Sequence, residues 1–128
     1  MDPLLAAKTG DNSLGEGQDS LVVIWSSGDR EVALKMAFMY AFNAKSKGWW
    51  KDVRLIVWGP STKLLSEDGE LQEYMRKMKD AGVILEACKT CSDQYGVSEQ
   101  LEELAIAVYH IGETLTTYLK DGRRVITF

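Results

Sequence analysis

The sequence predicts an α/β fold with a doubly wound, mostly parallel, five-stranded sheet. Apolar runs rich in Val, Ile and Leu alternate along the chain with longer segments of helical periodicity. Continuous apolar runs are typical of parallel strands that helices cover on both faces. Alternation of strand and helix throughout the chain indicates a doubly wound domain with right-handed crossovers.

The first strand–helix unit begins where the apolar pattern begins. Residues 21–25, "LVVIW", are a continuous apolar run and form the first predicted strand. Asp29 is placed to act as the N-cap of a largely buried helix over residues 30–47. The second predicted strand, residues 53–58, has the same apolar character as the first.

The next helix, over residues 66–82, is amphipathic, and Gly82 is a suitable stop. Its predicted inner face consists of Leu71, Tyr74, Met75 and Met78. The third strand, residues 83–86, leads to Cys88. A short helix closed by Gly96 follows.

The last third of the chain completes the alternation. Ser98 is predicted to cap a helix over residues 99–104, and residues 106–108 form the fourth strand. A helix over residues 112–122 is expected to turn Leu115, Tyr118 and Leu119 inward, and residues 123–128 form the fifth strand.

Composition limits the function classes. The chain has 128 residues, 45% of them hydrophobic and 27% charged, with a formal net charge of −4. An acidic balance without clustered Lys or Arg argues against nucleic acid and anionic membrane as partners. The longest apolar run, residues 36–42, is far shorter than the roughly 20 residues of a membrane-spanning helix.

The domain organisation is simple. Residues 1–18 are rich in small and polar residues and are predicted to be a flexible tail, and residues 19–128 form a single domain. The tail has no basic start and therefore does not look like a secretory signal. We expect a cytoplasmic protein whose thiols stay mostly reduced.

Three segments follow predicted strands at the edge where open parallel sheets bind ligands. The expected cleft-lining residues in the first two are Ser26, Ser27, Gly28, Asp29, Gly59, Pro60 and Ser61. Backbone N–H groups of the first segment can face an anion, and the hydroxyl of the second can donate to a ligand. Both segments equally fit ordinary turns, one with a cap and one under a half-buried Trp58.

The third segment carries the two cysteines of the chain, Cys88 and Cys91. Cys88 lies just past a strand and at a helix start, where the helix dipole favours a thiolate and Lys89 adds positive charge, while Glu86 opposes it. Cys91, one turn further on, can close a reversible disulfide with it under mild oxidant. The pair can also be two small residues packed in a core.

A metal centre is not expected, because structural zinc needs four ligands and the chain offers two cysteines and one histidine. We expect no cofactor. The histidine, His110, lies at the end of the fourth strand on the cleft side, where it fits either a base or donor or a structural residue.

Trp49 and Trp50 stand in a polar neighbourhood before the second strand. One of them can cap the core, and an exposed one would mark an interface. We expect this pair to form a contact between subunits.

These segments resemble the DsrE/DsrF-like family, which includes sulfur-relay subunits. The resemblance rests on "LVVIWSSGD", "VRLIVWGPS", "AGVILEACKTCSDQYGV" and "IGETLTTYLKDGRRVITF", and it extends from about Leu21 to Phe128. It implies a three-layer α/β/α fold, a homotrimer or homohexamer, and a persulfide on Cys88 that passes sulfane sulfur to or from a partner protein. Cys91 departs from the relay subunits and favours a dithiol variant.

Two functions follow as expectations. One is a sulfur-handling protein that carries sulfane sulfur on Cys88, assisted by Cys91, and is at most a carrier, transferase-like or thiol-redox protein. The other is an oligomeric small-ligand or protein-binding module whose cysteines have no catalytic role.

Overall fold

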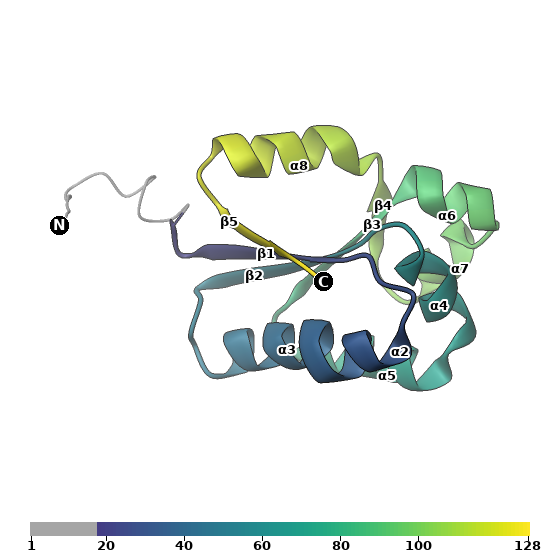
Figure 1. Cartoon of the computed structure of the whole chain (residues 1–128), viewed down its shortest axis with the longest axis horizontal. Helices are drawn as coiled ribbons and strands as arrows, with labels where there is room; N and C mark the ends of the chain where they lie inside the picture. Colours follow the sequence, from purple (N-terminus) through teal and green to yellow (C-terminus); the bar gives the residue numbers. More distant parts are fainter. Residues whose placement is uncertain (1–17) are drawn as a thin grey trace, which may run out of the picture.

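The structure is a computed structural model that describes residues 18–128, and it shows a five-stranded sheet between layers of helices (Figure 1). The strand order is β4-β3-β2-β1-β5, and every neighbouring pair is parallel. The strands are β1 (Ser20–Trp25), β2 (Asp52–Val57), β3 (Ile84–Cys88), β4 (Ala107–Tyr109) and β5 (Arg124–Thr127). The predicted three-layer, doubly wound α/β fold is confirmed. Apart from Gln18, the predicted tail lies outside the described residues.

The helices cover the two faces of the sheet unequally. One face packs against a layer that contains α2 (Arg30–Val32), η1 (Ala33–Ala37), α3 (Phe38–Ser46) and α5 (Gly69–Ala81), whereas α8 (Ile111–Lys120) lies on the other face (Figure 1). Helices α4 (Ser61–Glu67) and α6 (Lys89–Tyr95) lie at the end of the sheet to which the strands point, and α7 (Ser98–Glu103) follows α6. The larger core lies under α3 and α5, and a smaller one lies under α8.

Strand β1 is buried at every residue because β2 and β5 flank it and helices cover both of its faces. Val23 and Trp25 belong to the larger core, and Val22 and Ile24 belong to the smaller one. This explains why the run has no polar alternation.

The helix that follows β1 begins as predicted. The carboxylate of Asp29 accepts a hydrogen bond of 2.8 Å from the N–H of Glu31 and so caps the first turn. The predicted single helix is continuous but includes a π-helical turn, η1, between α2 and α3.

The segment after β2 differs from the predicted helix over residues 66–82. A helix already begins at Ser61 and ends at Glu67, and a second runs from Gly69 to Ala81. The break occurs at Asp68, whose extended backbone and carboxylate cap the second helix through the N–H groups of Glu70 and Leu71. Gly82 ends this helix at a φ of 106°, as predicted.

Two further predictions on helices were wrong. Ser98 is the first residue of α7 rather than its cap, and its hydroxyl donates to the carboxylate of Asp93. Leu119 is 55% exposed, because the inner face of α8 runs through Ile111, Leu115 and Tyr118, and Leu119 is rotated away from it. Among residues 18–128 no helix has the length and apolar character needed to cross a membrane.

Candidate functional site

Strand β3 delivers its side chains alternately to the two cores. Leu85 and Ala87 face the larger core, whereas Cys88 joins the smaller core under α8. Glu86 has the same parity as Cys88 and therefore lies on the same face of the sheet, one pleat earlier. Cys88 is the last residue of β3 and also occupies the N-cap position of α6. The strand thus extends two residues beyond its predicted end.

The two cysteines are free thiols that contact each other. Cys88 is 6% exposed and Cys91 is partly exposed in the first turn of α6. Burial raises the pKa of the Cys91 thiol, and a hydrogen bond with Cys88 raises this pKa further. Cys88 belongs to the smaller core and Cys91 packs against that core, so both thiols lie at the junction of β3 and α6.

A backbone donor faces the second cysteine. The N–H of Gly59 donates to the sulfur of Cys91 and partly opposes the rise of its pKa. Gly59 has a φ of 78°, a conformation that side chains other than hydrogen disfavour. The turn that sequence analysis singled out thus meets the C-x-x-C segment through its main chain.

The first two loops lie side by side as well. A methyl group on Gly28 would lie 3.4 Å from Cβ of Pro60. The N–H of Ser61 donates to the main-chain oxygen of Ser26 over 3.1 Å. The structure therefore brings all three predicted cleft segments together at the end of the sheet to which the strands point.

The side-chain oxygens in these loops are already used within the fold. Ser26 donates to the main-chain oxygen of Phe128 at 3.0 Å, and the hydroxyl of Ser27 accepts from the N–H of Asp29 at 3.0 Å. Ser61 is fully buried, and its hydroxyl donates to the main-chain oxygen of Trp25 at 2.5 Å. These hydroxyls hold the loops in place.

His110 lies beside the C-x-x-C segment. It is exposed and occupies the N-cap position of α8. Its Nδ1 lies 3.3 Å from Oγ1 of Thr90, a residue that stands between the two cysteines in the sequence. Lys89 forms an ion pair of 2.9 Å with Asp93. The hydrogen bond that Lys89 donates to that carboxylate is the main cause of the raised pKa of Lys89. The positive charge next to Cys88 is therefore shared with Asp93.

Glu86, which the sequence indicates only as a charge opposing a Cys88 thiolate, is the centre of a buried polar cluster. Glu86 is 3% exposed, and its Oε2 accepts from the hydroxyls of Tyr109 and Tyr118 and lies 3.5 Å from Nη1 of Arg54. Oε1 is buried and has no hydrogen-bond partner within the described residues. Burial raises the pKa of this carboxyl. The sequence could have indicated this cluster, because Glu86 is a charged residue inside a predicted buried strand and such residues need partners.

Tyr109 connects this polar cluster to the thiols. It is the in-register neighbour of Cys88 on β4, and it packs in the same core as both cysteines. Its hydroxyl reaches Glu86, so its ring is held from the far end. The ring of Tyr109, which its hydroxyl ties to Glu86, therefore packs on one side of the two cysteines.

The two tryptophans lie away from the thiols. Trp49 is 54% exposed, whereas Trp50 packs partly against the larger core and donates to the hydroxyl of Tyr40 at 3.1 Å. The ring of Trp49 lies 6.0 Å from that of Tyr40. Together with Met36, one turn before Tyr40 and 48% exposed, they form what we call the aromatic patch.

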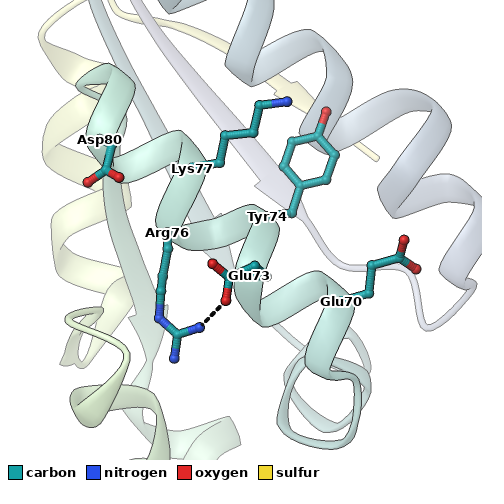
Figure 2. Close-up of a pocket in the computed structure, with 6 residues that line it drawn as sticks. All are labelled: Glu70, Glu73, Tyr74, Arg76, Lys77 and Asp80. Atoms are coloured by element: carbon teal, nitrogen blue, oxygen red, sulfur yellow. Dashed lines mark hydrogen bonds and ion pairs between the residues drawn. The ribbon is translucent and has the colours of Figure 1, made fainter.

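A hollow of about 430 Å³ lies along α5, and Figure 2 shows the side chains that line it. It is lined by Glu70, Glu73, Tyr74, Arg76, Lys77 and Asp80. Glu73 and Arg76 are ion-paired at 2.6 Å, and the ammonium of Lys77 lies 4.4 Å from the ring centre of Phe42. The lining contains neither cysteine nor histidine. Within residues 18–128, no cluster of three or more His, Cys, Asp or Glu side chains could hold a metal ion.

Comparison with known proteins identifies the family of this fold and site. No curated protein matches the chain. A conserved protein of unknown function from Bacteroides thetaiotaomicron, BT1422, has a similar structure with a TM-score of 0.83 and 35% identity, over 86% of this chain and 95% of that one. The ychN protein from E. coli has a TM-score of 0.68 and 17% identity, over 85% and 98% of the two chains. The model of the DsrE/DsrF-like family matches residues 19–128, and the chain therefore belongs to the DsrE/DsrF-like family.

Proposed function

We propose that this protein handles sulfane sulfur as a persulfide on Cys88, which it receives from a donor protein or small persulfide and passes to an acceptor. Membership of a family that includes sulfur-relay proteins supports this class of function. The observation that carries the choice of Cys88 is its place as the last residue of β3 and the N-cap residue of α6, with the second thiol in the next turn. Reactive cysteines are found at such helix starts.

The loading step needs only one thiolate and one donor. The Cys88 thiolate attacks the outer sulfur of a donor persulfide, the sulfur–sulfur bond of the donor breaks, and the donor leaves as its own thiolate. The product is a persulfide on Cys88. Transfer to an acceptor thiolate repeats the same exchange with Cys88 as the leaving group.

Cys91 is the more accessible sulfur of the pair, since Cys88 is 6% exposed and Cys91 is partly exposed. A donor approaching Cys88 therefore passes Cys91 and the Gly59 turn. His110 and Thr90 stand beside this approach and can hold the polar end of a donor. We assign no reacting role to these two residues.

Intact mass measurement on single-cysteine variants tests the proposal. Cys91→Ser, incubated with cysteine persulfide, is expected to gain one sulfur atom that a reductant removes, whereas Cys88→Ser gains none. Peptide mapping should place the added sulfur on Cys88. No gain in Cys91→Ser would contradict the proposal, provided that circular dichroism shows a folded variant.

The second candidate is an oligomeric binding module whose cysteines are structural. The burial of Cys88 within the smaller core favours it, because a buried thiol packs like a small apolar side chain. This candidate predicts that neither variant gains sulfur and that both keep the same oligomeric mass. The same mass measurement therefore separates the two functions.

A further inference from the structure

Cys91 lies in the first turn after Cys88 and packs against the core to which Cys88 belongs. A persulfide on Cys88 would have its inner sulfur where the Cys88 sulfur now lies, near the Cys91 thiol. The outer sulfur would be further away by up to one sulfur–sulfur bond, about 2 Å. Cys91 is thus placed next to the inner sulfur of the persulfide.

We propose that Cys91 resolves the Cys88 persulfide within the same chain and releases its outer sulfur as hydrogen sulfide. This inference rests on the proposed function and adds a product to it. Without an acceptor thiol the protein would reduce the persulfide, and an acceptor thiolate would compete with Cys91 for the sulfur on Cys88.

The step balances. The Cys91 thiolate attacks the inner sulfur, a bond forms between the two cysteine sulfurs, and the bond to the outer sulfur breaks. Hydrosulfide leaves with the electron pair and takes up a proton as hydrogen sulfide. The two cysteines are oxidised to a disulfide, and the sulfane sulfur is reduced to sulfide. An external thiol reductant, a small thiol or a dithiol protein, then restores both cysteines by ordinary exchange.

The backbone around the pair permits this disulfide. Cys88 is extended at the end of β3, and Cys91 is three residues further on, in the first turn of α6. Residues with this spacing on a helix have Cβ atoms about 5–6 Å apart, and disulfides need about 3.5–4.5 Å. The extended backbone of Cys88 allows its Cβ to approach, and both side chains pack in the same small core under α8.

The chemistry of the leaving group favours the inner sulfur as the point of attack. Hydrogen sulfide is a stronger acid than an alkyl thiol, and a more acidic thiol is the better leaving group. Burial raises the pKa of the Cys91 thiol, so this attack should become faster as the pH rises.

Single-turnover sulfide release tests this inference. Reduced protein, freed of reductant, is mixed with an equal amount of cysteine persulfide, and hydrogen sulfide, intact mass and disulfide mapping are followed together. Wild type is expected to release one hydrogen sulfide per chain and to end with a Cys88–Cys91 disulfide and no retained sulfur. Cys91→Ser should keep one sulfur on Cys88 and release only the background seen with the double variant Cys88→Ser/Cys91→Ser.

The alternative outcomes separate the two proposals. If wild type keeps a persulfide on either cysteine and forms no internal disulfide, the inference is overturned while persulfide loading stands. If Cys91→Ser takes up no sulfur, the proposed function itself fails. Cys91→Ala provides a second variant should the serine disturb the fold, and it is expected to retain sulfur in the same way.

Discussion

The hydroxyl of Tyr118 on α8 donates a hydrogen bond of 2.7 Å to Oε2 of Glu86 on β3. The two residues are far apart in the sequence, yet this bond ties α8 to the interior of the sheet. Within the described residues, α8 is the only helix that covers this face of the sheet (Figure 1). Burial raises the pKa of Tyr118 to about 12, with a further contribution from the bond to Glu86. The stability of the fold and its dependence on pH should therefore both depend on the bond between Tyr118 and Glu86.

The first prediction concerns pH and Glu86. Burial raises the pKa of its carboxyl above 4.5 in the folded protein, so the folded state binds a proton more tightly than the unfolded chain does. The contribution of Glu86 to the free energy of unfolding is then fully present below pH 4.5 and is lost as pH rises through the folded pKa. The difference in stability between wild type and Glu86→Gln should fall over this range, measured by urea unfolding.

The matched control is Glu73→Gln. Glu73 is exposed and ion-paired on α5, so its removal should leave the pH profile of stability close to that of wild type. If the free energies of unfolding of wild type and Glu86→Gln changed in parallel with pH, Glu86 would have the same pKa in the folded and unfolded protein, and the prediction would be wrong.

The second prediction is that Tyr118→Phe destabilises the fold by about 1.5–3 kcal/mol, the usual value of a buried hydrogen bond to a charged group. The ring remains to fill the smaller core, so the loss reports the hydroxyl. Thermal or urea unfolding measures it, with Tyr95→Phe, at an exposed site, as the control that should change little. A loss below about 0.5 kcal/mol would mean that Tyr109 and Arg54 suffice to hold Glu86.

The third prediction concerns thiol reactivity. Cys91→Ser should keep the fast-alkylating thiol near neutral pH, and Cys88→Ser should lose it, because the raised pKa of Cys91 keeps that thiol protonated. The alkylation rate of Cys88→Ser should still be rising above pH 9.0. A fast thiol that survives Cys88→Ser would assign the nucleophile to Cys91 instead.

The fourth prediction is that the protein is a homotrimer or homohexamer that uses the aromatic patch. Trp49→Glu introduces a charge at the most exposed residue of the patch and should lower the mass found by light scattering without unfolding the chain. Leu119→Glu, with a similar exposure of 55% on α8, is the control and should leave the mass unchanged. A monomeric wild type at micromolar concentration would remove the basis for this interface.

The sequence by itself determined the elements whose signals are local. The apolar run of β1, the cap at Asp29 and the stop at Gly82 depend on residues within one or two turns, and the structure reproduces all three. The same holds for the place of Cys88 at a strand–helix junction. These features depend on the backbone preferences and the apolar pattern of a short segment, which can be read without knowing what the segment packs against.

Only the tertiary structure decided which distant groups meet. The sequence predicts that Gly59 faces the cleft, but the effect of its N–H on the pKa of the Cys91 thiol depends on two loops that adjacent strands bring together. The hydrogen bonds of Glu86 depend on strand register and on where α8 crosses the sheet. Leu119 was misplaced for the same reason, since the rotation of a helix about its axis is set by the surface it covers and not by its own periodicity alone.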